Sequence, residues 1–398
     1  MTKATIDEAD VRGKRVLLRV DFNVPMRDGE IVDDRRIRSA VPTIEALRSR
    51  GARTIAVTHL GRPKGRVDDS LRVTPLARRL GELLGVEVRV APDVAGPGAR
   101  EVVASLHDGD VGMLENVRFE PGEEANDPGL TQQLAALADV YVNDAFGAAH
   151  RAHASTEGVA HLLPAYAGYL MARELDALGG VLEDPRRPVV AIVGGAKIST
   201  KLAVLQNLVD RVDVLWIGGA MACTFYQALG LATGRSLVEP DQVETARRLQ
   251  ESTRTRRAAL KLPVDVVVSA APDGSAPHHE VRAEAIPDGE MVVDVGSSTT
   301  DAIAADCRDA GTVVWNGPLG IYEVPAFAAG TRAVAMAVAD SPAYTVIGGG
   351  DLAAALHDTG VEDKIDHIST GGGATIEFLE GRTLPGVAAL REREAARS

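Results

Sequence analysis

The sequence predicts an α/β protein made of two doubly wound, parallel-sheet domains of the Rossmann-like kind, joined by a helix. Short β-branched runs alternate with stretches of helical period along almost all of the 398 residues, which is typical of parallel α/β sheets. A chain of this length exceeds one ordinary core, so we expect two domains. Strand ends are charged or polar in the first half and rich in glycine in the second.

The first half alternates predicted strands and helices. The strands are expected at residues 15–20, 54–60, 86–90, 111–114 and 139–144. Helical periodicity separates them at residues 33–51, 74–85 and 131–138. The first two helical segments end at glycine, which is common just after a helix. This alternation predicts a parallel sheet.

The second half repeats the scheme. Its strands are expected at residues 188–195, 212–219, 263–270, 291–296, 312–317, 344–350 and 366–373. We expect these strands to form a second parallel sheet, with glycine-rich turns at the carboxyl edge, where ligands bind in open α/β folds. Residues 214–232 are apolar enough to raise the question of a membrane span, but Gly218-Gly219 and a β-rich start favour a buried strand, loop and helix.

A connector is predicted between the halves. Residues 166–188 have the pattern of one helix that ends near Gly179-Gly180 and is followed by a proline-containing turn. We therefore assign residues 1–172 to an N-terminal domain and residues 173–383 to a C-terminal domain.

Composition excludes several classes of protein. With 45% hydrophobic and 25% charged residues the chain has the composition of a soluble globular protein. A net charge of −13 argues against nucleic acid or an anionic membrane as the main partner. Cys223 and Cys307 are expected to be small buried hydrophobes in a reducing cytosol. The first residues show no secretory signal, so we expect a cytoplasmic protein.

The two kinds of strand end predict two ligand sites. In the first half we expect a site for a small molecule that carries carboxylate and phosphate groups, because several arginines follow successive strands and the guanidinium fork suits both groups. Its candidate residues are Asp21, Asn23, Arg36, His59, Arg62, Arg118 and Arg151. In the second half, Lys197 and Lys201 lie four residues apart after a glycine pair. If that segment is helical they share one face and can bind one anion; the alternative is a solvated lysine pair.

The stretch "IGGGDLAAA" (347–355) also fits a dinucleotide-binding fingerprint. Asp351 would repel a bare pyrophosphate, but it is suited to hold Mg²⁺ that is bound to the phosphates of a nucleotide. The alternative is that Asp351 caps the following helix.

The motifs together resemble those of phosphoglycerate kinases. They are, in order, "RVDFNVP", "HLGRP", "LENVRF", "FGAAHRAHAS", "GGAK", "WNGP", "GGGD" and "STGGGA". The resemblance implies a bilobal kinase in which the tail, residues 384–398, packs back on the N-terminal domain. It implies reversible phosphoryl transfer between 1,3-bisphosphoglycerate and ADP, giving 3-phosphoglycerate and ATP with Mg²⁺ as cofactor, and a monomer that closes its domains over the substrates.

The resemblance also implies residue roles. Arg36, Lys197 and Lys201 match catalytic residues, and Asp351 matches the metal ligand. The residues implied to bind 3-phosphoglycerate are Asp21, Asn23, Arg36, His59, Leu60, Gly61, Arg62, Arg118 and Arg151. The residues implied to bind the nucleotide are Gly195, Ala196, Lys197, Lys201, Gly218, Gly219, Gly296, Asn316, Glu323, Gly349, Gly350, Asp351 and Leu352.

The residue types agree with that chemistry. Both nucleophiles, an ADP phosphate oxygen and a carboxylate, are already ionised, so the reaction needs alignment and positive charge instead of a general base. Three positions depart from the family's usual residues, namely Thr200, Ser297 and Leu352. One alternative is therefore a non-catalytic relative that binds nucleotide or phosphoglycerate. Another is a dehydrogenase that uses the fingerprint to bind a dinucleotide.

Overall fold

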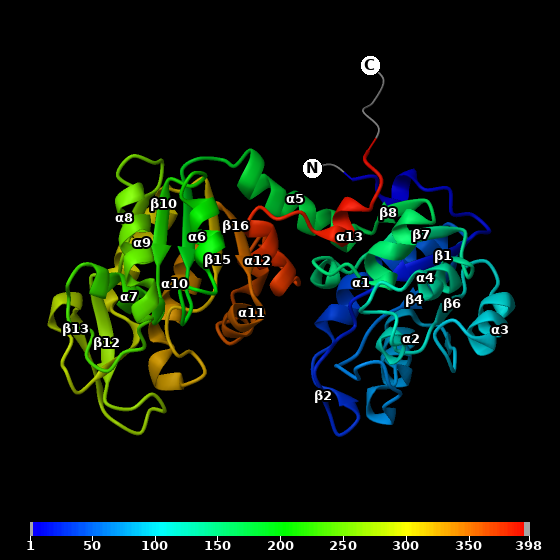
Figure 1. The fold of residues 1–398 in the computed structure, drawn as a ribbon, viewed down its shortest axis with the longest axis horizontal. Coiled ribbons are helices and arrows are strands. Elements are labelled where there is room, and N and C mark those ends of the chain that lie inside the picture. The colour runs from blue at the N-terminus through cyan, green and yellow to red at the C-terminus, as the bar shows by residue number, and fades with distance from the viewer. Residues whose placement is uncertain (1–2, 394–398) are drawn as a thin grey trace, which may run out of the picture. The chain divides into compact units, whose positions relative to one another are not determined.

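The computed structural model describes residues 3–393, apart from the side chain of Asp351. The chain divides into two compact units (Figure 1). Unit 1 comprises Met1–Asp176 and Thr383–Ser398, and unit 2 comprises Ala177–Arg382. Helix α5 (Tyr169–Glu183) contains the boundary between them.

Unit 1 is built on a parallel sheet with the strand order β5-β6-β4-β1-β7-β8. The strands are β1 (Arg15–Arg19), β4 (Arg53–Val57), β5 (Val88–Val90), β6 (Val111–Met113), β7 (Val140–Asn143) and β8 (Ala165–Ala167). The helices are α1 (Arg35–Ser49), α2 (Thr74–Leu84), α3 (Pro97–Ser105), α4 (Pro128–Ala135) and α13 (Pro385–Ala388). A hairpin of β2 (Met26–Arg27) and β3 (Glu30–Ile31) precedes α1.

The core of unit 1 follows from the apolar spacing of its elements. Helix α1 buries Ile37, Ala40, Ile44 and Leu47, which recur at the three- and four-residue intervals that share one helix face. This face packs in one cluster with β1 and β4 and with α2. Strand β1 is buried along Val16–Arg19, as expected for a central strand covered on both faces.

Unit 2 is built on a second parallel sheet, in the order β11-β10-β9-β15-β16-β17. The strands are β9 (Val189–Val193), β10 (Val214–Ile217), β11 (Ala259–Lys261), β15 (Thr312–Asn316), β16 (Tyr344–Gly348) and β17 (His367–Ile368). The helices are α6 (Leu202–Leu208), α7 (Met221–Ala228), α8 (Val243–Ser252), α9 (Ser297–Asp309), α10 (Ala329–Ala339), α11 (Gly350–His357) and α12 (Gly373–Leu379). The α/β class and the parallel sheets predicted from the sequence are confirmed.

Two predicted strands of the second half belong to a separate antiparallel sheet, so their assignment to the parallel sheet was wrong. Strands β12 (Asp265–Ser269) and β14 (Met291–Val295) pair with each other, and β13 (His278–Arg282) pairs with β12. The connection from β12 to β13, residues 270–277, is too short for the crossover of a dozen or more residues that parallel neighbours need. The segment between β12 and β14 contains the strand β13 instead of a crossover α-helix.

The connector helix also differs from the prediction. Helix α5 starts at Tyr169, after the unpredicted strand β8, and continues through Gly179-Gly180 to Glu183. Glycine in a helix costs only about 1 kcal/mol relative to alanine, and Leu178 and Val181 on either side of the pair are buried. The burial of these side chains outweighs the local preference of the chain to end the helix at the glycine pair.

In the described residues, the apolar stretch 214–232 contains a strand and a helix instead of a membrane span. Residues 214–217 form strand β10 and Met221–Ala228 form helix α7, as predicted. Among the helices of residues 3–393, none is long and apolar enough to cross a membrane. Cys223 and Cys307 are buried free thiols, which confirms their expected packing role.

Candidate active site

The carboxyl edge of the unit 1 sheet gathers the polar residues predicted for the first site. Asp21 and Asn23 follow β1, His59 to Arg62 follow β4, Arg118 follows β6 and Arg151 follows β7. Strands β6, β4, β1 and β7 are consecutive neighbours in the sheet, so the loops that follow them meet at one edge. Arg36 joins them from the first turn of α1.

Asp21 organises one end of this edge. Arg36 donates from Nη1 to Asp21 Oδ2 at 3.0 Å and to the Asn23 carbonyl oxygen at 3.3 Å. Burial alone would raise the pKa of Asp21, but its interactions with His59, Arg36 and Arg19 lower it below its ordinary value. Asp21 is therefore ionised, and it holds a guanidinium that is still 36% exposed. Arg36 thus keeps part of its fork available to a ligand.

The turn after β4 is fixed from two sides. Asn23 Oδ1 accepts from the Gly61 amide at 2.9 Å, and Arg118 Nη1 donates to the Gly61 carbonyl oxygen at 2.7 Å. Gly61 has a φ of +63°, a left-handed conformation that suits glycine. The Leu60 side chain is 2% exposed, so only the backbone of Leu60 can meet a ligand.

The remaining arginines of unit 1 differ in their surroundings. Burial lowers the pKa of Arg118, and the charge of Arg151 lowers it further. Arg151 Nε also contacts His150 Nε2 at 3.1 Å. Arg62 is exposed to solvent. The structure therefore connects Asp21, Asn23, Arg36, Gly61 and Arg118 directly, and leaves Arg62 outside the hydrogen bonds described for this edge.

Sequence reasoning missed Arg19, which ends β1 and is 1% exposed. Its guanidinium contacts His59 Nδ1 at 3.1 Å and donates to Ser155 Oγ at 2.9 Å. The available signal was an arginine inside the apolar run of a central strand, since a buried cation requires partners.

The carboxyl edge of the unit 2 sheet is made of tightly packed glycine loops. A methyl group added at Gly194 would lie 2.1 Å from the Pro318 carbonyl oxygen, and one added at Gly219 would lie 2.5 Å from the Gly195 carbonyl oxygen. Gly219 also has a φ of +69°. These loops follow β9, β10 and β15, which are neighbours in the sheet. Only glycine permits such close backbone approach.

The two lysines do not lie on a helix, so that part of the prediction was wrong. Helix α6 begins at Leu202, Lys201 is its N-cap residue, and Lys197 lies in the preceding loop. Lys201 Nζ hydrogen-bonds Asn316 Oδ1, and Asn316 Nδ2 donates to the Gly348 carbonyl oxygen at 2.9 Å. Lys201 is thus held where β9, β15 and β16 end, whereas Lys197 is exposed.

Asn316 was predicted to bind nucleotide, and the structure shows that it also links three strands. It is 2% exposed. The Gly194 amide donates to its carbonyl oxygen at 2.9 Å. Asn316 therefore joins the loop after β9 to the loop after β16.

The loop after β16 leads directly into α11. Gly349 has a φ of +107°, and a methyl group added at Gly350 would meet no atom within 4 Å, so the backbone there is open. The first amides of α11 are unpaired within the helix and suit an anion. The metal ligand predicted from the sequence, Asp351, has its side chain outside the described residues. The Leu352 side chain is fully buried in the unit 2 core, so only its backbone can contact a nucleotide.

The other predicted nucleotide residues lie in less connected places. Ala196 and Glu323 are exposed. Gly218 packs on Leu319. Gly296 ends the antiparallel strand β14, where its amide donates to the Asp265 carbonyl oxygen at 3.0 Å. Ser297, a departure from the family pattern, donates from Oγ to Glu280 Oε2 at 2.8 Å.

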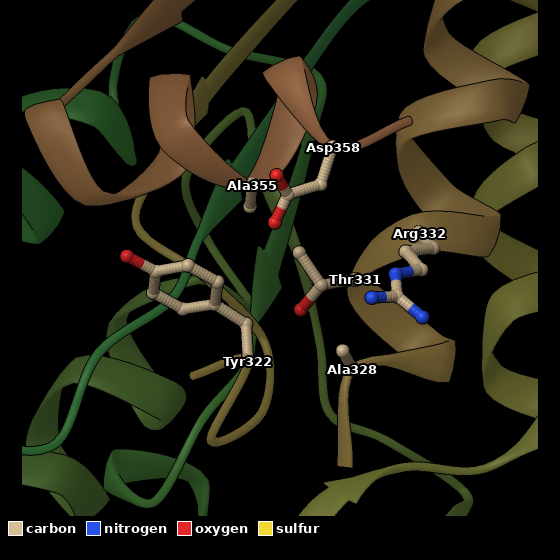
Figure 2. A pocket seen from close by; sticks show the side chains of 6 residues that line it. All are labelled: Tyr322, Ala328, Thr331, Arg332, Ala355 and Asp358. Atoms are coloured by element: carbon tan, nitrogen blue, oxygen red, sulfur yellow. The ribbon is translucent and has the colours of Figure 1, made fainter. Parts of the chain in front are cut away.

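A small, shallow surface hollow lies in unit 2 (Figure 2). It is lined by Tyr322, Ala328, Thr331, Arg332, Ala355 and Asp358. Figure 2 shows the Asp358 carboxylate pointing towards the Thr331 side chain, with Tyr322 on one side of Thr331 and Arg332 on the other. None of the lining residues is one of the residues predicted to bind the nucleotide, although Tyr322 precedes Glu323 in the sequence and Ala355 lies on α11.

Comparison with known proteins gives full-length matches. A model of the phosphoglycerate kinase family matches residues 6–382. The phosphoglycerate kinases of Moorella thermoacetica and Pelotomaculum thermopropionicum are each 54% identical over 393 residues, which is 99% of this chain and 100% of each relative. That of Chloroflexus aggregans is 52% identical over 400 residues, with 99% of this chain and all of the relative covered.

Solved structures agree with the sequence matches. The phosphoglycerate kinase of Coxiella burnetii is 40% identical, with a TM-score of 0.90 over 97% of this chain and 98% of that one. The enzyme of Pyrococcus horikoshii is 33% identical, with a TM-score of 0.85 over the same shares. Since the predicted motifs fall on two sheet edges and the match extends along nearly the whole sequence, the chain belongs to the phosphoglycerate kinase family.

Proposed function

We infer that this chain catalyses the reaction of its family, the reversible phosphoryl transfer from 1,3-bisphosphoglycerate to ADP, and we assign one substrate to each sheet edge. Phosphoglycerate binds at the edge of unit 1, and ADP or ATP binds at the edge of unit 2. The observation that carries this assignment is the difference between the edges. One presents Arg36, His59 and Arg118 around Asp21, and the other presents glycine loops and Lys201.

The residues of unit 1 have chemistry that suits a small acid phosphate. The arginines of this edge supply charge for a phosphate and a carboxylate. Asp21 keeps Arg36 in place, so the guanidinium is oriented before the ligand arrives. Arg36 then offsets the negative charge of the transferred group, a role that needs position more than acid–base chemistry.

The residues of unit 2 suit the nucleotide phosphates. The amides at the start of α11 and the open backbone at Gly350 accommodate the phosphate oxygens. Lys201, held by Asn316, adds a fixed positive charge near the same strand ends. Lys197 lies in a loop and is exposed, so we propose that it reaches the transferred group only when substrate is bound.

We propose that Mg²⁺ enters with the nucleotide and that Asp351 contacts it. The glycine loop before α11 fits this assignment because a metal-bound phosphate can approach its backbone without meeting a Cβ atom. When bound, Mg²⁺ neutralises charge on the phosphate oxygens. The residues of the chain position the nucleotide for that role.

Transfer requires the two substrates to be in line and in contact, yet each edge belongs to its own compact unit. We therefore propose that the units close over the substrates, which also excludes the water that would hydrolyse an acyl phosphate. Residues 147–156 and the Gly179-Gly180 pair are the proposed hinge positions. Small-angle scattering on the apo, binary and ternary states tests this, since an unchanged radius of gyration contradicts closure. We further propose that the protein acts as a monomer in the cytoplasm, and sedimentation of the purified chain tests the monomer.

The activity is tested with ATP, Mg²⁺ and 3-phosphoglycerate in an assay coupled to reduction of the bisphosphoglycerate product. Turnover that needs all three components supports the proposal. Retained binding of both substrates without turnover would instead indicate a non-catalytic relative. Binding of NAD in place of ADP would favour a dehydrogenase.

A further inference from the structure

Arg19 is a buried cation that the proposed reaction does not use. It lies between the buried residues Leu18 and Val20 at the end of β1, and 1% of it is exposed. Burying a charge is costly unless hydrogen bonds and opposite charges compensate. The hydrogen-bond partners of Arg19 therefore indicate what its buried charge contributes to the site.

One side of the Arg19 guanidinium is anchored to the loop after β7. Nε donates to Ser155 Oγ at 2.9 Å. Ser155 in turn donates from Oγ to Glu123 Oε1 at 2.6 Å and from its amide to Glu123 Oε2 at 3.0 Å. Glu123 is fully buried, so this series of hydrogen bonds fixes the position of the Arg19 guanidinium.

The other side of the guanidinium meets the imidazole of His59. Arg19 Nη2 lies 3.1 Å from His59 Nδ1. Arginine carries only donors, so this contact is a hydrogen bond only when Nδ1 has a free lone pair. An imidazole with a lone pair on Nδ1 is neutral and carries its hydrogen on Nε2.

The charges around His59 favour the same state. Burial lowers the pKa of His59 well below its ordinary value, and the cations Arg19, Arg118 and Arg151 lower it further. Asp21 opposes them, with Oδ1 at 3.9 Å from Nδ1. Asp21 follows β1, Arg118 follows β6 and Arg151 follows β7, so the charges that act on His59 come from neighbouring loops of the sheet.

We propose that Arg19 is a positioning residue that holds His59 as the neutral imidazole with its hydrogen on Nε2. His59 then offers phosphoglycerate a hydrogen-bond donor whose state does not change across neutral pH. Without Arg19, Asp21 would be the nearest charged partner of Nδ1 and would draw a hydrogen onto that nitrogen. The inference rests on the proposed binding of phosphoglycerate at this edge.

The first test uses the wild-type protein, so it does not depend on any variant folding. Histidine is labelled with ¹⁵N, the His59 signals are assigned by loss in His59→Gln, and long-range ¹H–¹⁵N spectra are recorded from pH 6 to 8. We expect a protonated Nε2 and an unprotonated Nδ1 throughout. A hydrogen on Nδ1, or an imidazolium at pH 7, would overturn the proposal.

The second test compares Arg19→Met with Arg48→Gln, a control in which another arginine of unit 1 loses a hydrogen bond, to Gly109. In Arg19→Met we expect His59 to titrate between pH 6 and 8. We also expect KM for 3-phosphoglycerate to rise about tenfold, the effect of one impaired hydrogen bond, with KM for ATP unchanged. Arg19→Lys, which keeps a cation, should recover part of the loss.

The outcomes separate the two proposals. An Arg19→Met protein whose His59 spectrum matches wild type contradicts the positioning role, even if its KM is raised. Wild-type His59 signals that do not move when 3-phosphoglycerate is added contradict the assignment of the substrate to this edge, whatever the tautomer is.

Discussion

Arg36 Nη1 lies 3.0 Å from Asp21 Oδ2, and this ion pair joins the first turn of α1 to the loop after β1. Asp21 is 10% exposed and Arg36 is 36% exposed. The carboxylate is therefore buried behind the guanidinium, and the guanidinium is the part that solvent and ligands can reach. The pair has the arrangement of a catalytic cation fixed from behind.

Arg36→Ala should abolish turnover and leave ADP binding nearly unchanged. The cation belongs to unit 1, and its loss removes charge stabilisation that matters only during transfer, which costs about a hundredfold or more in rate. Steady-state kinetics and ADP calorimetry measure both effects. Arg35→Ala is the matched control, since Arg35 is the neighbouring residue and pairs with Asp33 on the surface. Near wild-type turnover in Arg36→Ala would remove Arg36 from the mechanism.

Asn316→Ala should weaken ADP binding about tenfold and lower kcat as well. The variant releases Lys201 and leaves the Gly348 carbonyl oxygen without its side-chain donor, which costs roughly 1–3 kcal/mol for buried groups. Asn207→Ala is the control, because Asn207 also bridges two partners in unit 2, namely Arg211 and Leu379, away from the glycine loops. Equal effects on ADP affinity in both variants would show a general loss of packing.

Asp351→Asn should weaken Mg²⁺-ADP much more than metal-free ADP, because a metal ligand matters only when the metal is present. Calorimetry with Mg²⁺ and with a chelator measures the two affinities. Equal losses in both titrations would favour the helix-cap alternative.

Leu352→Thr should lower the stability of unit 2. Leu352 is fully buried in the unit 2 core. Replacing it with the smaller, polar threonine should cost about 1–3 kcal/mol of unfolding free energy. Thr200→Asp, at an exposed position, should change the unfolding free energy by less than about 0.5 kcal/mol. Chemical denaturation measures the unfolding free energy of both variants. An unchanged midpoint for Leu352→Thr would contradict the buried placement of Leu352.

The stability of unit 2 should fall as the pH rises towards 7 because of Asp294. Burial raises the pKa of this carboxyl group from 3.8 to about 7, although it accepts from the Gly330 and Val295 amides, and the charge of Glu280 adds to the rise. The folded state therefore keeps a proton that the unfolded chain has lost. The contribution is fully present below pH 4 and is lost between about pH 4 and 7, at roughly 1.4 kcal/mol for each pH unit that separates the folded and unfolded pKa values.

The test of that prediction compares wild type with Asp294→Asn, which cannot ionise. The unfolding free energy of wild type should drop relative to the variant between about pH 4 and 7. Asp301→Asn, at an exposed position of α9, serves as the control. A constant difference between wild type and Asp294→Asn over this range would contradict the raised pKa.

Local sequence patterns were enough to predict the fold class and the residue types at the two sheet edges. Strand and helix periods are local properties, and so is the kind of residue that follows each strand. Because the ends of parallel strands meet at one edge, the residues after β1, β4 and β6 could be grouped before their contacts were known. The glycine pairs after β9 and β10 were predicted to lie in turns at the carboxyl edge of a sheet, and the structure places them there.

Which groups face each other depends on contacts between distant parts of the chain, and these became known from the fold. The apolar pattern of residues 263–270 and 291–296 is that of any buried strand, and the direction of β12 and β14 depends on their pairing partners. Lys201 owes its position to Asn316, which is 115 residues away in the sequence. The same holds for Arg19, whose contact with His59 crosses from β1 to the loop after β4. Such contacts depend on strand order and packing at long range, which no local pattern records.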